Sequence, residues 1–108
     1  MQVTTPQIEQ LAAQSADAAA LLRAMANQQR LLMLCHLSAA RELSVSALGE
    51  RMSLSQSALS QHLARLREDG IVAFRREAQT LFYHIADDRA ARLLELLQEL
   101  YCPQLQGS

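Results

Sequence analysis

The stretch SVSALGERMSLSQSALSQHLARLREDG, from Ser44 to Gly70, decides the fold, because it predicts two short helices joined by a tight turn. Val45, Leu48 and Met52 recur at the spacing of one apolar face of a first helix. Ser44 stands just before that face, where a serine side chain accepts a hydrogen bond from a first-turn N–H and starts the helix. The Asp–Gly pair that closes the stretch signals the end of the second helix.

The second helix carries the same kind of local signals. Ser55 is its expected N-cap, and Leu54 and Leu59 stand at the positions of a hydrophobic staple. Leu63 and Leu66 continue the apolar face that begins at Leu59. Two short helices with so small a turn predict a helix–turn–helix, whose second helix enters a DNA groove.

The polar face of the second helix suits contacts with bases and phosphates. It carries hydroxyls, amides and guanidinium groups, with no acidic residue before Glu68. Glutamine and arginine read base edges in the major groove, and serine bonds a base or a phosphate. Polarity alone favours an ordinary solvated face, whereas the small turn, the helix lengths and the missing acids favour DNA. The residues of this helix predicted to contact DNA are Ser55, Gln56, Ser57, Ser60, Gln61, Arg65 and Arg67.

Length and composition limit the remaining choices. The 108 residues are expected to form one domain, 1–108, with flexible ends at 1–6 and 105–108. Half of the residues are apolar but only 4% are aromatic, so the core must be aliphatic, as in a helical protein. The net charge of −1 does not indicate nucleic-acid binding, so any phosphate-binding surface has to be a local patch of positive charge.

Several functional classes have no signal in this sequence. It has no apolar run of membrane-spanning length and no secretory leader pattern, so a cytoplasmic protein is expected. Phosphate-cradling glycine loops, nucleophile elbows and CxxC pairs are missing too. The sequence therefore predicts neither an enzyme nor a cofactor.

Helical periodicity precedes the helix–turn–helix. From Gln7 to about Met25 the pattern predicts one alanine-rich helix, with more apolar surface than a small monomer can cover. Asn27 is the expected cap of a helix that runs to about Ala39. Its run LLMLCHL is apolar nearly all round, so we expect this helix at the centre of the domain.

After Gly70 the periodicity changes to that of strands. Residues 71–74 and 80–85 predict a β-hairpin with a connection of roughly four residues, Glu77 to Thr80. A hairpin directly after a recognition helix is the wing of a winged helix. Polar residues near its tip are predicted to reach a phosphate or a narrow minor groove, although a solvated turn is an equal alternative for each one alone. They are Arg75, Arg76 and Gln79.

The last helix is expected to start at Asp87 or Asp88 and to end before Pro103. Its leucines cover more than one face, so one face is left for a partner subunit. The whole pattern predicts a mainly α protein with a small β-hairpin, ordered helix, helix, helix, helix, strand, strand, helix. We expect it to be a homodimer joined through its first and last helices.

With these elements in place, the chain resembles the ArsR family of dimeric winged-helix repressors. The resembling segments are AMANQQRLLMLCHL, ELSVSALGERMSLSQSALSQHLARLREDGIV and REAQTLFYHI. The resemblance is nearer to the BigR, SqrR and HlyU group than to the metal sensors of the family. It implies that Cys35 and Cys102 are a sensing dithiol, with a persulfide, polysulfide or oxidant as inducer and a near-palindromic DNA operator as partner.

Metal sensing is disfavoured by departures from the family pattern. Where metal-sensing relatives carry Cys-x-Cys, this chain has Ser44 and Ser46, and a hydroxyl does not replace a thiolate as a soft-metal ligand. A second family site uses acids and histidines on the last helix, and no histidine follows Asp87 and Asp88 there. Three histidines remain, and none of them predicts a metal site: His36, His62 and His84.

The two cysteines leave alternatives open. Two distant cysteines in a cytosolic protein are ordinarily unrelated buried thiols, and neither local sequence offers an activating cation. The resemblance reverses that preference and favours a homodimeric repressor whose operator affinity is switched by reversible chemistry at Cys35 and Cys102. One alternative is a winged-helix protein-interaction module with structural cysteines. The other is a metal-responsive repressor with atypical ligands.

Overall fold

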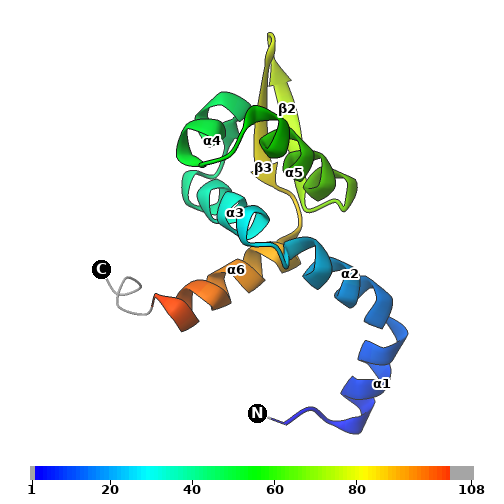
Figure 1. Ribbon diagram of the computed structural model, residues 1–108. Helices are drawn as coiled ribbons and strands as arrows, with labels where there is room; N and C mark the ends of the chain where they lie inside the picture. Colours follow the sequence, from blue (N-terminus) through cyan, green and yellow to red (C-terminus); the bar gives the residue numbers. More distant parts are fainter. Residues whose placement is uncertain (1, 103–108) are drawn as a thin grey trace.

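The computed structural model describes residues 2–102, which form a three-stranded antiparallel sheet and a set of helices around it (Figure 1). This arrangement confirms the mainly helical winged helix–turn–helix predicted from the sequence. Pro103 and the tail at 105–108 lie outside the described residues. The elements are α1 (Thr5–Ala13), α2 (Ser15–Met25), α3 (Gln28–Ala40), β1 (Leu43–Ser44), α4 (Val45–Arg51), α5 (Gln56–Glu68), β2 (Val72–Glu77), β3 (Thr80–Ile85) and α6 (Asp88–Tyr101).

The N-terminal region forms two helices where the sequence pattern predicted one. α1 and α2 meet at Gln14, whose backbone (φ −116°, ψ 13°) leaves the helical conformation. α1 begins within the segment predicted to be flexible, because Thr4 and Gln7 form a capping box. The Thr4 hydroxyl accepts the Gln7 N–H at 3.4 Å, and the Gln7 side-chain oxygen accepts the Thr4 N–H at 2.9 Å. No residue of α1 is buried, and the helix extends away from the rest of the domain (Figure 1).

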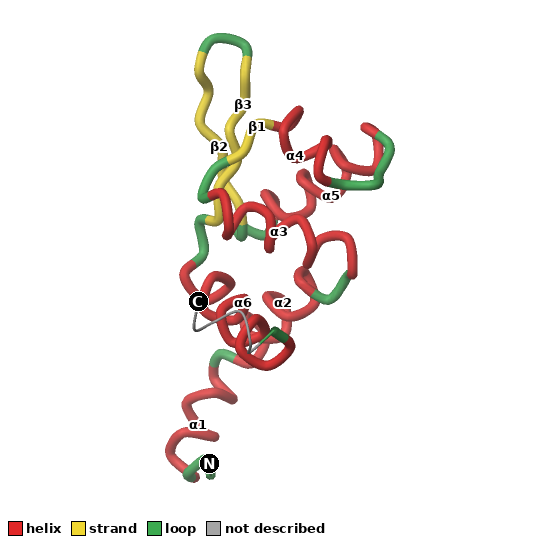
Figure 2. Tube along the Cα trace, turned by 90° about the vertical axis from the view of Figure 1, so that its left-hand side faces the viewer, coloured by secondary structure: helices red, strands yellow, loops and turns green. Residues whose placement is uncertain are grey.

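α3 lies at the centre of the domain, as its nearly all-round apolar run predicted. Met33, Leu34 and Leu37 are completely buried. The helix packs against α2, α4, α5, α6 and β3, and Figure 2 shows it between the helix–turn–helix and the pair α2 and α6. Asn27 caps its first turn by accepting the N–H groups of Gln29 and Arg30, both at 3.0 Å. Any movement of α3 therefore reaches most of the fold.

The helix–turn–helix forms from the predicted caps. The Ser44 hydroxyl accepts the Ala47 N–H at 3.0 Å, and the Ser55 hydroxyl accepts the Ala58 N–H at 3.1 Å. α4 and α5 approach closely at Gly49, where an added Cβ would lie 3.3 Å from a Leu59 methyl carbon. This close approach keeps the two helices in one rigid unit.

α5 ends in a Schellman motif that directs the chain into the wing. Gly70 takes the left-handed conformation (φ 73°), which glycine adopts without a side-chain clash. The N–H of Ile71 bonds the Leu66 carbonyl at 3.0 Å, and the N–H of Gly70 bonds the Arg67 carbonyl at 3.0 Å. The predicted Asp69–Gly70 stop is thus correct, and β2 begins two residues after Gly70.

The sheet has the strand order β1-β3-β2, so β3 lies in the middle. Tyr83 of β3 pairs with Leu43 of β1 on one side and with Phe74 of β2 on the other. The hairpin between β2 and β3 turns through two residues, Ala78 and Gln79, which is tighter than the predicted connection because Glu77 still belongs to β2 and Thr80 already belongs to β3. Ala78 has a left-handed backbone (φ 55°). Figure 1 shows this hairpin projecting beyond the helices.

α6 closes the opposite side of the domain from the wing. Asp87 is its N-cap and accepts the N–H groups of Arg89 and Ala90 at 2.8 and 3.3 Å. Ala90 and Leu94 are completely buried, and the helix packs against α3 and β3. Among residues 2–102 no helix has both the length and the apolar character needed to cross a membrane.

Candidate nucleic-acid interface and thiol pair

The polar face of α5 is open to solvent. Gln56, Ser57, Ser60 and Gln61 are all exposed, while the opposite face of the helix is buried in the core. Ser55 is exposed as well, and its hydroxyl keeps its own O–H as a donor while its oxygen caps the helix. Ser55 can therefore cap α5 and still donate a hydrogen bond to a ligand at this end of the helix.

A groove of about 630 Å³ lies between the helix–turn–helix and the wing. It brings together Gln56 at the start of α5 and Gln79 at the tip of the wing, which the sequence analysis had named separately. Ser46 and Thr80 also line it, and sequence reasoning missed both. The missing signal is the pairing of Ser44 with Phe82, because that pairing sets the start of α4 beside β3. The groove is lined by Ser44, Val45, Ser46, Gly49, Leu54, Gln56, Gln79, Thr80 and Leu81.

The arginines of the predicted interface differ in their partners. Arg65 forms an ion pair with Asp69 at 2.9 Å, and the Arg67 guanidinium lies over the Phe74 ring at 5.2 Å. Both side chains remain exposed, so these contacts leave their outer N–H groups free to meet a ligand. Arg76 is exposed and forms no ion pair or side-chain hydrogen bond with any other described residue.

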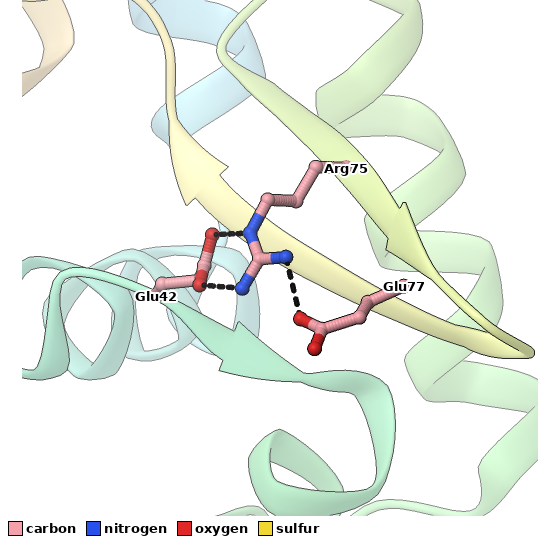
Figure 3. A network of polar contacts seen from close by, with 3 residues as sticks. All are labelled: Glu42, Arg75 and Glu77. Atoms are coloured by element: carbon pink, nitrogen blue, oxygen red, sulfur yellow. Dashed lines mark hydrogen bonds and ion pairs between the residues drawn. The ribbon is translucent and has the colours of Figure 1, made fainter.

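Arg75 has a different environment from Arg76, although both are exposed residues of β2. The Nε and one terminal nitrogen of Arg75 donate to the two carboxylate oxygens of Glu42, both at 2.9 Å (Figure 3). Its other terminal nitrogen donates to Glu77 at 2.8 Å, and the guanidinium lies over the Phe82 ring at 4.6 Å. The hydrogen bond from Arg75 holds the pKa of Glu42 below its usual value, so this carboxylate stays charged near neutral pH.

The two cysteines are free thiols, and both are half-buried. Cys35 lies on α3, and Cys102 immediately follows α6 as its C-cap residue. Burial is the main cause that raises the pKa of Cys35, and the negative charge of a Cys102 thiolate raises that pKa further. Because α3 packs against α6, the two cysteines belong to neighbouring helices of a single protomer, Cys35 within α3 and Cys102 at the end of α6.

An apolar surface runs over α1, α2 and α6. Leu11 and Leu22 are more than half exposed, as are Ile8 on α1 and Leu100 on α6. A groove of about 330 Å³ between α1, α2 and α6 joins these helices, and Leu93 lines it from the α6 side. Such a surface on a small domain is typical of a protein–protein contact.

The three histidines lie on three different elements. His36 lies on α3, His62 on α5 and His84 on β3, and each is half-buried. Within residues 2–102, no group of three or more His, Cys, Asp or Glu side chains is arranged to hold a metal ion.

A helix–turn–helix whose second helix exposes a polar face with no acidic residue before Glu68, followed by a projecting β-hairpin, defines a winged-helix DNA-binding protein. Comparison with known proteins agrees, since residues 27–73 match the model of the bacterial regulatory protein family named arsR. The chain belongs to this ArsR family of DNA-binding transcriptional regulators, whose members regulate transcription and are not enzymes. This result favours a DNA-binding regulator over the alternative of a winged-helix protein-interaction module with structural cysteines.

Individual relatives cover most of the chain. It is 52% identical over 95 residues to the transcriptional activator HlyU of Vibrio cholerae, covering 88% of this chain and 87% of HlyU. The structure of reduced HlyU from Vibrio cholerae superposes with a TM-score of 0.80 at 52% identity, over 87% of this chain and 98% of that one. The transcriptional repressor BigR from Xylella fastidiosa superposes with a TM-score of 0.78 at 34% identity, over 93% and 98% of the two chains. The predicted resemblance to the HlyU and BigR group is thereby confirmed.

Proposed function

We propose that the protein is a homodimeric repressor that binds a near-palindromic DNA operator and releases it when Cys35 and Cys102 become linked. Membership of a DNA-binding family supports the first part. Repression follows the precedent of BigR, which is named a transcriptional repressor, whereas HlyU is named an activator. The protein would act where the DNA is, in the cytoplasm.

The polar face of α5 and the adjoining groove are the proposed reading surface. The amides of Gln56 and Gln61 suit base edges, and the hydroxyls of Ser57 and Ser60 suit a base or the nearest phosphates. Ser55, Arg65 and Arg67 extend this surface along α5 toward phosphates. On the wing, Gln79 and Arg76 are proposed to follow the adjacent groove of the duplex.

The apolar surface over α1, α2 and α6 supports the proposed dimer. Two copies that bury this surface against each other would form a symmetric particle with two recognition helices, and a symmetric particle suits a near-palindrome. Each half-site would then be contacted by one α5, with half-sites about one helical turn or more apart.

The thiol switch depends on where the two cysteines lie, and this placement is the observation that carries the proposal. Cys35 is on α3, which packs on both α5 and α6, and Cys102 ends α6. A covalent link between them ties the proposed dimer helix to the helix that supports the recognition helix. The link need not unfold anything, because a change in the spacing of two recognition helices is enough to spoil their fit to one duplex.

The proposed chemistry is sulfur transfer followed by displacement. One cysteine thiolate takes the outer sulfur of a persulfide R–S–SH, forming Cys–S–SH and releasing the thiol R–SH. The second cysteine thiolate then attacks the inner sulfur and expels hydrosulfide, which leaves a disulfide. A polysulfide that transfers two sulfur atoms in the first step leaves a trisulfide by the same displacement. An oxidant such as peroxide instead forms a sulfenic acid, which condenses with the second thiol and releases water.

The test measures operator affinity before and after treatment of the thiols. The operator is obtained by selecting bound duplexes from a random pool, and binding is followed by fluorescence anisotropy. We expect a persulfide donor to weaken binding between tenfold and a thousandfold, a coupling of roughly 1.4–4 kcal/mol. Cys35→Ser and Cys102→Ser should each bind normally when reduced and stay bound after treatment.

Mass spectrometry of the treated protein identifies the link between Cys35 and Cys102. A loss of two hydrogen atoms indicates a disulfide, and each additional sulfur atom adds its own mass. Release of DNA by either single variant on treatment would show that a paired-thiol switch is wrong. The cysteines would then return to a structural role.

A further inference from the structure

The Glu42–Arg75 pair fastens the wing to the body of the domain. Arg75 is on β2, an edge strand, and Phe82 is its pairing partner on the central strand β3. Phe82 pairs with Ser44 on its other side. The Arg75 side chain lies over the Phe82 ring and bonds Glu42, which immediately precedes β1. One side chain thus crosses the whole width of the sheet.

This tie supplements a short strand pairing. β1 consists of Leu43 and Ser44 alone, so the wing is joined to β1 through only two residue pairs. A bidentate bond between a guanidinium and a carboxylate fixes the orientation of both groups, which a single contact does not. Glu42 is itself held close to the end of α3, because Arg41, the C-cap of that helix, lies between them in a left-handed conformation (φ 69°).

The neighbouring arginine lies on the other face of the hairpin. Successive residues of a strand point to opposite faces. Arg76 pairs with Leu81 and shares its face with the buried Tyr83, whereas Arg75 shares the opposite face with Phe82. Arg76 is therefore on the face of the sheet that turns toward the core, and Arg75 is on the outer face.

The surrounding charges also distinguish Arg75 from Arg76. Arg75 donates to two carboxylates, those of Glu42 and Glu77, so the cluster of these three residues is net negative. A phosphate that approached Arg75 would meet both carboxylates. Arg76 forms no ion pair with the other described residues and presents its positive charge uncompensated.

We propose that Arg75 is a positioning residue that holds the wing through Glu42, and that Arg76 alone of the two makes the wing's phosphate contact. The proposal rests on the proposed contact of the wing with DNA and corrects the equal roles that the sequence suggested for the two arginines. Glu42 accordingly becomes a residue needed for DNA binding, although a negative charge near DNA is ordinarily unfavourable.

The decisive variant is Glu42→Gln, measured on the selected operator by anisotropy at several salt concentrations. If Glu42 positions the wing, its loss weakens binding about three- to thirtyfold, as does Arg75→Ala, and the double variant loses no more than either single one. If Arg75 instead contacts phosphate and Glu42 competes for it, Glu42→Gln tightens binding, and the proposal is overturned.

Lysine at position 75 separates the two roles further. A lysine ammonium serves as a point-charge phosphate contact but cannot form the bidentate pair. We expect Arg75→Lys to bind as weakly as Arg75→Ala, with an unchanged salt slope. The matched control, Arg76→Ala, should lower the slope by about one, and Arg76→Lys should restore it. Full rescue of binding by Arg75→Lys would overturn the proposal.

Amide hydrogen exchange of the free protein tests the tie without DNA. Glu42→Gln and Arg75→Ala should speed exchange across residues 72–85, whereas Arg76→Ala should leave it unchanged. Unchanged exchange in the first two variants would overturn the tie itself. Faster exchange together with full DNA affinity in all the wing variants would instead remove the wing from the DNA interface, and so contradict the proposed function.

Discussion

Cys102 lies at the end of α6, which packs against the helix of Cys35, and the charge of its thiolate raises the pKa of Cys35 in addition to the larger effect of burial. The thiolate is the reactive form of cysteine, so a raised pKa slows Cys35 at neutral pH.

The pH dependence of Cys35 alkylation tests this coupling. In the wild-type protein we expect the rate with iodoacetamide to keep rising with pH beyond about 8.5, the ordinary value for a free cysteine. In Cys102→Ser the midpoint should move to lower pH, because the neighbouring negative charge is gone. It should still remain above the ordinary value, because burial, the larger cause, persists. Peptide mass mapping follows Cys35 alone, and identical profiles in the two proteins would show that the thiols are independent.

We expect Gln61 to contribute to the recognition of the operator's base sequence. Its side chain is exposed in the middle of the polar face of α5, so an amide there is placed for a base edge. Gln61→Ala should cost on the order of 1–3 kcal/mol on the selected operator and less on random DNA. Gln28→Ala, at an exposed glutamine at the start of α3, should change neither affinity. Equal losses on both DNAs from Gln61→Ala would mean that this residue does not discriminate between bases.

The dimer is tested at α6, where the structure distinguishes two neighbouring leucines. Leu96 is 48% exposed, whereas Leu97 is half-buried. Leu96→Glu should therefore give a folded monomer, because it sets a charge in the proposed interface without touching the core. Leu97→Glu should also lower thermal stability. Leu32→Glu, at a leucine on α3 that is 45% exposed, is the matched control.

Sedimentation at micromolar concentration measures the assembly, and circular dichroism measures the fold. A dimeric Leu96→Glu variant would show that this part of α6 faces solvent, while a monomeric wild type would remove the dimer from the proposed function. Monomer formation in the Leu32→Glu control would indicate that the interface extends to α3.

What the sequence could predict was governed by local chemistry. Ser44, Ser55 and Asn27 cap helices through bonds to residues two or three positions away, so their roles are visible in the sequence itself. The same logic was available for the capping box of Thr4 and Gln7, whose Thr-x-x-Gln spacing is its signature. The alanine-rich pattern continues past Gln14, so the sequence suggested one helix from Gln7 where the structure has α1, which begins at Thr5, and α2.

The partners of the arginines were not predictable in this way. Arg75 and Glu42 are 33 positions apart and meet only because β3 lies between β1 and β2. Periodicity indicated the two strands of the hairpin but not the two-residue strand that brings Glu42 beside them. The sequence therefore identified a basic wing and could not say which of its arginines is already engaged.

Asp87 offers a test of local stability with a definite pH dependence. Its carboxylate bonds the side chain of Arg89 and the N–H groups of Arg89 and Ala90, and these contacts, the Arg89 side chain first, lower its pKa. A carboxylate whose pKa is lowered in the folded state stabilises the fold at pH values above its pKa in the unfolded chain, which is about 4. That stabilisation fades as the pH falls through the folded value. We expect Asp87→Ala to lower the free energy of unfolding by about 1 kcal/mol at pH 7, chiefly through the lost cap, since Arg89 is largely exposed.

Urea unfolding at pH 7 and at a pH near 3 measures this difference. The gap between wild type and Asp87→Ala should shrink at the lower pH, because protonation weakens the wild-type cap. Asp88→Ala is the matched control: Asp88 is exposed in the first turn of α6 and accepts no side-chain hydrogen bond from another described residue, so its loss should matter less. Asp87→Asn keeps the cap acceptor without the charge, so it should retain most of the stability at pH 7 and show little pH dependence. An equal loss in the Asp87 and Asp88 variants would show that α6 is stabilised by charge near its N-terminus and not by the Asp87 cap.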